Sequence, residues 1–370
     1  MRVMVLGLRG FPAVQGGVET HAEHLYPILV QLGCEVDVIT RATYMPKNMK
    51  AWQGVRFQRL WTPPWNGVEA FVHTFVGVLY AAVKRPDVLH VHAIGPAIWV
   101  PLARALGLKV VVTHHGPDYD REKWGAIAKY LLKTGERLGM QFANERIVIS
   151  NVIRNLVNKK HHCDSVVIPN GVSLPEIPDS KKTLQEFHLE SEKYVLLVSR
   201  LVPEKRHLEL IEAFSQANLN GWKLVLVGAI DKSDAYCKRV MAAAEKSNTV
   251  ILTDFQTGNA LQELYANAGI FVLPSSHEGL PIALLEALSY GISTLASDIP
   301  ANLEVGLATE QYFPLGDVSA LADSLRNFQS GKIPRAKREN LRNWVNEKYN
   351  WNDVADKTLA VYQHVAPTKR

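Results

Sequence analysis

The sequence contains few cysteines, and their arrangement excludes two common kinds of site. Cys34, Cys163 and Cys237 are the three cysteines among 370 residues, and they lie far apart. No pair has the short spacing of a zinc site, and three are too few for a disulfide framework. We therefore expect no metal site, no disulfide and a reducing, cytoplasmic environment.

Long apolar runs are also missing. A membrane-spanning helix needs about 20 consecutive apolar residues, and no segment of this sequence supplies them. The best candidate, residues 68–83, is interrupted by Glu69 and His73, so we predict a packed helix there. The apolar run after Met1 is about five residues long, too short for a signal peptide, and we predict a buried first strand.

The glycine-rich loop after this strand lacks the dinucleotide-binding pattern. Gly7, Gly10, Gly16 and Gly17 do not have the spacing Gly-x-Gly-x-x-Gly, which argues against a nicotinamide-dependent oxidoreductase. Gly16 and Gly17 nevertheless place unobstructed N–H groups at the start of a helix, where phosphate binds. A tight turn that needs positive φ explains the two glycines equally well.

Positive charge is unevenly distributed along the chain. The net charge is +5, but residues 1–172 have 20 lysines and arginines against 12 acidic residues, and the remainder has 21 against 24. A first half of net charge +8 suits an anionic membrane surface or an acidic acceptor. Scattered surface lysines are the simpler explanation, and since no dense basic run is present, nucleic acid is not an expected partner.

Short β-branched runs alternate with longer amphipathic segments, which is typical of a parallel α/β sheet. The cycle occurs twice, so we predict two doubly wound, Rossmann-like domains. The predicted strands are residues 2–6, 35–40, 55–60, 88–92, 109–114 and 146–150, then 194–199, 223–227, 250–253, 270–273 and 293–296. The predicted helices are residues 19–32, 71–83, 97–106 and 124–142, then 208–217, 235–246, 261–267, 282–290 and 318–328.

A polar, proline-containing stretch at residues 168–193 is the expected link between the domains. We place the first domain at residues 1–172 and the second at 173–350, with a last helix at 351–366 packing back on the first. Ligands of open α/β sheets bind beyond the carboxyl ends of the strands. We therefore expect the two domains to face an interdomain cleft that holds the substrates.

Two adjacent histidines end one predicted strand of the first domain. Neighbouring side chains in an extended segment point to opposite faces, so only one of His114 and His115 faces a site at this edge. His90 and His92 end the preceding strand, where a role in the core or behind the site is the better explanation.

Two cations follow a predicted strand of the second domain. Arg200 and Lys205 lie in one loop, and a guanidinium together with an ammonium suits a diphosphate. A solvated loop is the alternative explanation.

A glutamate-bearing segment follows another strand of the same domain. Glu278 lies in a loop, and Gly279, Leu280 and Pro281 follow it at the start of a helix whose N–H groups can hold phosphate. Glu286 lies on that otherwise apolar helix, and a buried carboxylate needs a partner. A ribose diol is one possible partner, and solvent or an internal arginine is another.

Together these segments resemble the retaining glycosyltransferases of family 4, which have the two-domain GT-B fold. The resemblance covers nearly the whole chain, and its most specific part is the spacing of Glu278 and Glu286. The opening loop is similar to that of a subgroup with bacterial rhamnosyltransferases of surface polysaccharide assembly. The other matching segments are Gly16-Gly17, Thr113-x-His115-Gly116, Ile168-Pro169-Asn170-Gly171-Val172 and Ser199-Arg200 with Lys205.

The resemblance implies a role for each matching residue. Arg200 and Lys205 would bind the donor diphosphate and stabilise the leaving group, and Glu286 would hold the donor ribose. Glu278 would lie beside the transferred sugar, and His115 would contact it near the reacting carbon. The remaining donor-site residues would be Gly16, Gly17, Gly279, Leu280 and Pro281.

The resemblance also implies a reaction. A hexosyl group, such as rhamnosyl, would pass from a nucleotide diphosphate sugar to a saccharide or an undecaprenyl-diphosphate-linked acceptor, with retention and without a metal or other cofactor. Peripheral contact with the cytoplasmic face of the inner membrane fits such an acceptor. A nucleotide-sugar epimerase, which binds the same donor and needs no acceptor, is the alternative. The sequence leaves open the base, the sugar, the acceptor and the oligomeric state.

Overall fold

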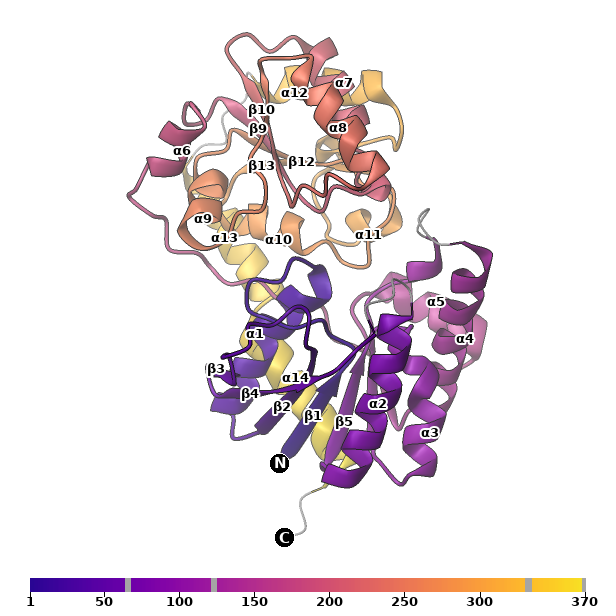
Figure 1. Cartoon of the computed structure of the whole chain (residues 1–370). Helices are drawn as coiled ribbons and strands as arrows, with labels where there is room; N and C mark the ends of the chain where they lie inside the picture. Colours follow the sequence, from indigo (N-terminus) through magenta and orange to yellow (C-terminus); the bar gives the residue numbers. More distant parts are fainter. Residues whose placement is uncertain (64–67, 121–124, 330–334, 368–370) are drawn as a thin grey trace. The chain divides into compact units, whose positions relative to one another are not determined.

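The structure, a computed structural model, describes residues 1–63, 68–120, 125–329 and 335–367. These residues form two compact units (Figure 1). Unit 1 is Met1–Gly171 together with Trp351–Arg370, and unit 2 is Val172–Asn350. Each unit is built on its own sheet, so each is described by itself.

Unit 1 contains an eight-stranded sheet in the order β3-β4-β2-β1-β5-β6-β7-β8. All neighbouring strands are parallel except β3 and β4. Its central strands β1, β5 and β6 are buried on both faces, as helices on both sides require. The strands are β1 (Arg2–Leu6), β2 (Glu35–Arg41), β3 (Ala51–Trp52), β4 (Val55–Leu60), β5 (Val88–His92), β6 (Val110–His114), β7 (Glu145–Val148) and β8 (Val166–Val167).

The helices of unit 1 include one from the far end of the chain. α14 packs beside α1 (Figure 1), and Trp351 and Tyr362 of α14 are buried with Leu25 and Tyr26 of α1 in one core cluster. This packing makes α14 part of unit 1. The helices are α1 (Gly17–Gln31), α2 (Glu69–Lys84), η1 (Pro96–Trp99), α3 (Val100–Ala105), η2 (Asp118–Asp120), α4 (Ala126–Phe142), α5 (Asn151–His161) and α14 (Trp351–Val365).

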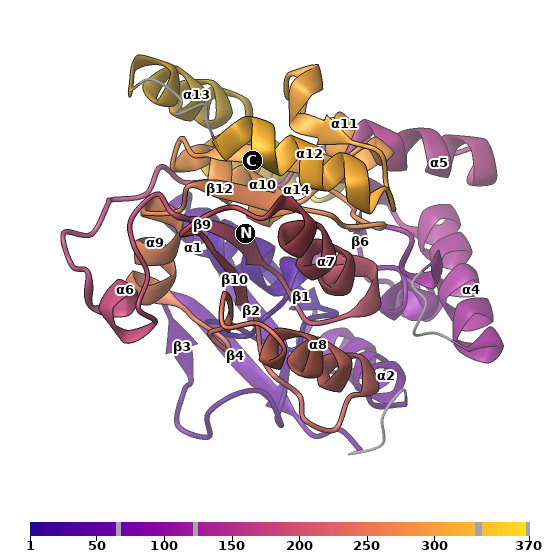
Figure 2. The same ribbon diagram turned by 90° about the horizontal axis from the view of Figure 1, so that it is seen from above.

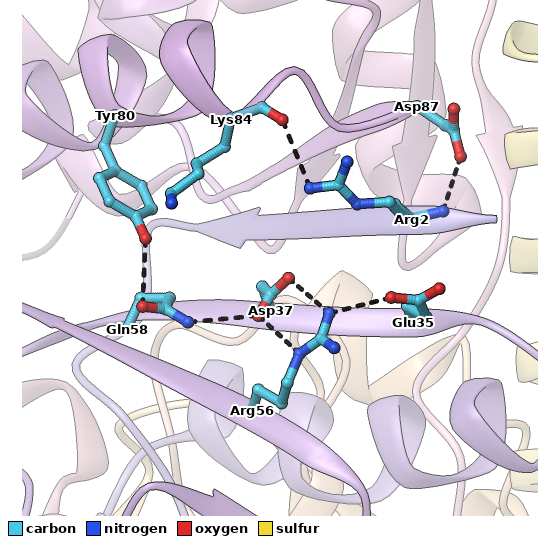
Figure 3. A network of polar contacts seen from close by, with 8 residues as sticks. All are labelled: Arg2, Glu35, Asp37, Arg56, Gln58, Tyr80, Lys84 and Asp87. Carbon is cyan, nitrogen blue, oxygen red and sulfur yellow. Dashed lines mark hydrogen bonds and ion pairs between the residues drawn. The ribbon is translucent and has the colours of Figure 1, made fainter.

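A polar network ties the strands of unit 1 together near their amino ends (Figure 3). Arg56, near the start of β4, donates two hydrogen bonds of 2.9 Å to Asp37 of β2. The backbone N–H of Arg2, at the start of β1, donates to Asp87 at 2.7 Å, just before β5. Because ligands of such sheets bind at the carboxyl ends, we assign these contacts to stability and not to a binding site.

Unit 2 contains a six-stranded parallel sheet in the order β11-β10-β9-β12-β13-β14. Helix α7 contacts both α8 and α12, and α10 contacts α13 (Figure 2). The strands are β9 (Tyr194–Val198), β10 (Lys223–Val227), β11 (Val250–Leu252), β12 (Ile270–Leu273), β13 (Ser293–Ser297) and β14 (Tyr312–Phe313). The helices are α6 (Lys182–Glu186), η3 (Pro203–Lys205), α7 (His207–Ala217), α8 (Ala235–Glu245), α9 (Gly258–Ala266), α10 (Ile282–Ser289), α11 (Pro300–Leu303), η4 (Thr309–Gln311), α12 (Val318–Gln329) and α13 (Arg335–Lys348).

The two parallel sheets confirm the predicted fold class, but some predicted elements were wrong in detail. Residues 97–106 form η1 and α3 instead of one helix, because Pro101 has no N–H to continue the bonding of the preceding turn. The strand predicted at 146–150 ends at Val148, and Ser150 accepts a hydrogen bond of 3.2 Å from the N–H of Ile153 as the cap of α5. Residue 124, the predicted start of a helix, lies outside the described residues.

Several elements were not predicted at all. Helices α5 and α13 are rich in polar residues, so neither has a wide apolar stripe to reveal it in the sequence. The expected link at residues 168–193 contains the short helix α6. Within the described part of the chain, no helix combines the length and apolar character that crossing a bilayer requires.

Candidate functional site

The strand order of unit 2 identifies the loops where a ligand is expected. From β9 the chain moves outward to β10 and β11, and then returns to β12 on the other side of β9. The order reverses between β9 and β12, and ligands of doubly wound sheets bind beyond the carboxyl ends of such strands. The loop after β9 contains Arg200 and Lys205, and the loop after β12 contains Glu278.

These two loops contact each other directly. The ammonium group of Lys205 pairs with the carboxylate of Glu278, and both side chains are mostly buried, at 16% and 11% exposed. The N–H of Ser276 donates to the carbonyl of Glu204 at 2.9 Å and holds one loop against the other. Arg200 extends over the same loop, with its guanidinium 4.0 Å from the carboxylate of Glu204. The structure therefore brings Lys205 and Glu278 together at the reversal point, with Arg200 in the same loop as Lys205.

Helix α10 begins directly after the second loop. Pro281 is its N-cap residue, directly before the predicted first helical residue Ile282, and Leu280 is buried beside it. Gly279 lies between Glu278 and Leu280 in the same loop. Glu286 lies one turn into the helix, partly buried, and its carboxylate accepts a hydrogen bond of 2.8 Å from the hydroxyl of Tyr265. That hydroxyl is a partner that the sequence did not identify.

The equivalent reversal in unit 1 lies between β1 and β5. The loop after β1 leads through Gly16 to Gly17, the first residue of α1. A Cβ at Gly16 would lie 2.1 Å from the carboxylate of Glu19 and 2.5 Å from the guanidinium of Arg9, so this glycine makes room for that ion pair. A Cβ at Gly17 would meet no atom within 4 Å, so packing within unit 1 does not explain this glycine.

The structure gives the two adjacent histidines different neighbours. His114 is fully buried, and its ring lies 2.9 Å from the carboxylate of Glu136 on α4. Burial alone would raise the pKa of Glu136, but hydrogen bonds from His114 and Tyr119 lower it below its ordinary value. His115 contacts His92 and His21 instead, and it is less completely buried than His114. His114 is thus a core residue, and His115 is the one at the open edge.

Sequence analysis missed the network that holds His115. Nε2 of His115 lies 2.9 Å from Nδ1 of His92, and Nε2 of His92 contacts the hydroxyl of Tyr26. His21, on the first turns of α1, approaches His115 with ring centroids 5.0 Å apart. Burial lowers the pKa of His115 and His92 well below the ordinary value, so both rings are neutral.

Asn170 gives the Ile-Pro-Asn-Gly segment a structural role. Its side-chain oxygen lies 2.9 Å from Nδ1 of His21, 149 residues away, and both residues are buried. Because an amide oxygen only accepts, His21 carries its proton on Nδ1 and leaves Nε2 with a lone pair. In the sequence, His21 follows the glycine pair in the pattern Glu19-x-His21. This pattern became informative only when the fold showed that His21 lies beside His92 and His115.

One Asp-x-Asp segment was overlooked in the prediction of metal independence. Asp118, Tyr119 and Asp120 form η2 in unit 1, and carboxylates at this spacing are able to bind a hard divalent cation. Tyr119 is buried and donates a hydrogen bond of 3.0 Å to Glu136, which ties the segment to α4. Metal independence therefore needs an experimental test.

Family models match the two halves of the chain separately. Residues 15–175 match the model described as Glycosyltransferase Family 4, and residues 179–351 match the model of glycosyl transferases group 1. The boundary between the two matches lies beside the boundary between the two units.

Individual proteins of known name or structure are also similar. An uncharacterised glycosyltransferase of Bacillus subtilis, YqgM, is 29% identical over 58% of this chain and 59% of its own length. The Escherichia coli UDP-Gal:alpha-D-GlcNAc-diphosphoundecaprenol alpha-1,3-galactosyltransferase is 26% identical over 77% of both chains. The structure of a sucrose-phosphate synthase from Thermosynechococcus elongatus superposes with a TM-score of 0.85 at 20% identity, over 98% of both chains.

Proposed function

We propose that this chain, which is a glycosyltransferase of the GT-B fold, moves a hexosyl group from a nucleotide diphosphate sugar to a saccharide or lipid-linked saccharide acceptor. The observation that carries the donor assignment is the ion pair of Lys205 and Glu278 at the strand-order reversal of unit 2, with Arg200 in the same loop as Lys205. Transfer occurs with retention, and rhamnose is one of the sugars that fit the proposal. The relative that uses UDP-galactose and a diphosphoundecaprenol-linked acceptor supports this choice of substrates.

The chemistry of the leaving group explains the cations. As the bond from the sugar to the diphosphate breaks, negative charge grows on the departing oxygen. In the proposed reaction, the positive charges of Arg200 and Lys205 oppose that growing charge. A stabilised diphosphate needs no general acid, and we propose that the reaction needs no metal either.

The other site residues have separate proposed tasks. Glu286 binds the ribose diol of the donor, and the N–H groups at the start of α10 bind phosphate. Glu278 lies beside the transferred sugar, and the neutral ring of His115 contacts that sugar near its reacting carbon. The acceptor binds to unit 1, where a Cβ added at Gly17 would meet no atom within 4 Å.

The test of this proposal is a donor screen followed by a transfer assay. Thermal unfolding is measured with UDP, GDP, dTDP and ADP, because a ligand at 100 times its Kd adds about 2.7 kcal/mol of stability. The matching labelled nucleotide sugars are then incubated with and without lipid-linked and free saccharides. Transfer to an acceptor supports the proposal, whereas an epimerised sugar formed without acceptor supports the epimerase alternative.

We expect Glu286→Ala to weaken nucleotide binding by roughly 10- to 100-fold, since a hydrogen bond to a charged group contributes about 1.5–3 kcal/mol. The measurement is the Kd of the preferred nucleotide by calorimetry. Glu212→Ala, at an exposed glutamate of α7, is the control and should bind as the unchanged chain does. A large loss of melting temperature in Glu286→Ala without nucleotide, and an unchanged Kd, would show a purely structural glutamate.

We also propose that unit 1 contacts the cytoplasmic face of the membrane through α4. Gly135 and Gly139 pack the inner side of this helix closely against η1 and the residues before it. Its outer side exposes Ile127 at 80% and Tyr130 at 70%, and Lys133 is exposed on the same helix. Apolar side chains beside basic ones suit the interface of an anionic bilayer, where a lipid-linked acceptor is found.

Vesicle binding tests this surface. We expect the double variant Ile127→Ser, Tyr130→Ser to lose most of its binding to anionic vesicles of phosphatidylglycerol, because it removes the apolar side chains that enter the interface. Val83→Ser changes an equally exposed apolar residue of α2, at 81%, and should bind as before. Equal losses in both variants, or no binding by the unchanged chain, would contradict the assignment to α4.

A further inference from the structure

Three histidines of unit 1 converge from different elements of the fold. His21 lies on α1, His92 ends β5 and His115 follows β6. One ring nitrogen from each lies within 4.8 Å of the other two. The ring centroids of His21 and His92 are 5.7 Å apart, and those of His92 and His115 are 5.2 Å apart. Such a convergence needs a chemical explanation beyond the packing of apolar residues.

The protonation of the three rings suits metal coordination. Burial lowers the pKa of His21 to about 4 and those of His92 and His115 well below their ordinary value. All three rings are therefore neutral at pH 7, and neutral imidazole is the form that binds metal ions. Nε2 of His21 carries a lone pair, because its Nδ1 proton is bonded to Asn170.

The hydrogen bond between His92 and His115 uses one nitrogen of each ring and does not involve His21. Nδ1 of His92 and Nε2 of His115, 2.9 Å apart, share one proton, and the lone pair of His21 is not needed for that bond. A metal ion accepts a lone pair from all three rings at once. Two nitrogens 2.9 Å apart, each about 2.0–2.1 Å from a metal, subtend about 90° at the ion, which is an acceptable angle between neighbouring ligands.

The outer nitrogens of two rings already have the partners that metal-binding histidines usually have. Asn170 accepts from His21, and the hydroxyl of Tyr26 contacts Nε2 of His92. Partners of this kind fix the tautomer and the orientation of a ligating ring. The three ligands include no carboxylate, and sets of imidazoles prefer zinc, nickel, cobalt or copper to magnesium or calcium.

We propose that His21, His92 and His115 form a binding site for one divalent transition-metal ion, with Zn²⁺ or Ni²⁺ as the typical occupant. Binding by itself does not depend on the proposed function. The consequence does: because His115 acts on the transferred sugar in the proposed reaction, an ion on its ring inhibits transfer. The site is therefore inhibitory and separate from the metal-free reaction.

Binding is tested on the full chain after removal of metals with EDTA. Co²⁺ is added as a spectroscopic probe, and Zn²⁺ and Ni²⁺ are titrated by calorimetry. We expect one equivalent per chain, with visible cobalt bands that Zn²⁺ abolishes. His21→Ala should weaken binding at least tenfold. His24→Ala is the control, because His24 lies one turn further on α1, stacks on Trp351 and should bind as the unchanged chain does.

A gain of affinity separates coordination from misfolding. Asn170→Asp replaces an amide by a carboxylate that accepts the same proton, and a carboxylate makes a ligating histidine more basic. We expect Zn²⁺ to bind several-fold more tightly to this variant, a result that an unfolded chain does not give. Binding that is unaffected by His21→Ala and by Asn170→Asp belongs to surface histidines and overturns the proposal, as does no binding at all.

The consequence for activity is measured separately. We expect Zn²⁺ to inhibit transfer by the unchanged chain and EDTA to restore it, with the EDTA-treated protein fully active. Activity that EDTA abolishes and Mg²⁺ restores would contradict metal independence and point to the Asp118–Asp120 segment, while leaving the cobalt result valid. If no donor supports transfer, the proposed function fails, and the binding experiments still decide the metal site.

Discussion

Lys205→Ala is expected to lower turnover by about 10²–10³-fold, or roughly 3–4 kcal/mol of transition-state stabilisation, while unit 2 remains folded. Lys205 is one of the two cations in the loop after β9, and its ammonium pairs with Glu278. During the reaction it opposes the charge that grows on the diphosphate, and alanine provides no substitute. Initial rates with the preferred nucleotide sugar give the effect on kcat and on KM separately.

The control for this experiment is another paired lysine of the same unit. Lys193 binds Glu190 at 2.6 Å on the surface, so Lys193→Ala removes an ion pair without touching the proposed site. We expect it to keep normal turnover, since exposed ion pairs contribute little. In Lys205→Ala, the carboxylate of Glu278 loses its ion pair with the lysine. The double variant Lys205→Ala, Glu278→Gln removes the charge of that carboxylate and shows how much of the lost turnover it causes. Normal turnover in the Arg200→Ala, Lys205→Ala double variant would remove the diphosphate assignment.

Acid is expected to destabilise unit 1 through a histidine with no part in the proposed reaction. His73 on α2 is 1% exposed, and its ring lies against the backbone of Thr40. Burial, followed by the charge of Arg41, lowers its pKa from 6.5 to about 4, although the contact with Thr40 raises it slightly. Between these two pKa values, His73 is protonated in the unfolded chain and neutral in the folded chain.

The direction of the pH dependence of stability follows from the number of protons that the folded and unfolded chains bind. Between pH 6.5 and about 4 the unfolded chain carries a proton on His73 that the folded chain lacks, so the free energy of unfolding falls as the pH falls. The loss is about 1.4 kcal/mol per pH unit, or roughly 3 kcal/mol over the window. His73→Phe removes this group and leaves no buried nitrogen behind. We expect the variant to be as stable as the unchanged chain at pH 7.

Denaturant unfolding of both chains at pH 7 and at pH 4.5, with EDTA present, measures the difference. Because the other titrating groups are common to both proteins, their contributions largely cancel. The unchanged chain should lose more stability than His73→Phe between the two values. Equal losses would show that His73 is protonated in the folded state, and a severe loss at pH 7 would show that its ring makes an essential polar contact.

Local patterns were sufficient for the fold class and for the edge of each sheet where chemistry is expected. The alternation of apolar strands and amphipathic helices predicted two parallel sheets, and the boundaries of β1, β4, β5, β10 and β12 match the predicted ranges. The period of two along a strand also separated His114 from His115 before any coordinates were considered. These features depend on neighbouring residues, so the sequence expresses them directly.

The fold class, the ends of the strands and the residue types gathered there can therefore be predicted from the amino-acid sequence. Which of those residues contact one another depends on the three-dimensional order of the strands. Lys205 and Glu278 are 73 residues apart and pair because β12 returns to the side of β9. His21 and Asn170 are 149 residues apart and meet because the chain segments after β1 and after β8 both lie beyond the carboxyl ends of strands of one sheet. The order of strands results from packing over the whole chain, and no local pattern encodes it.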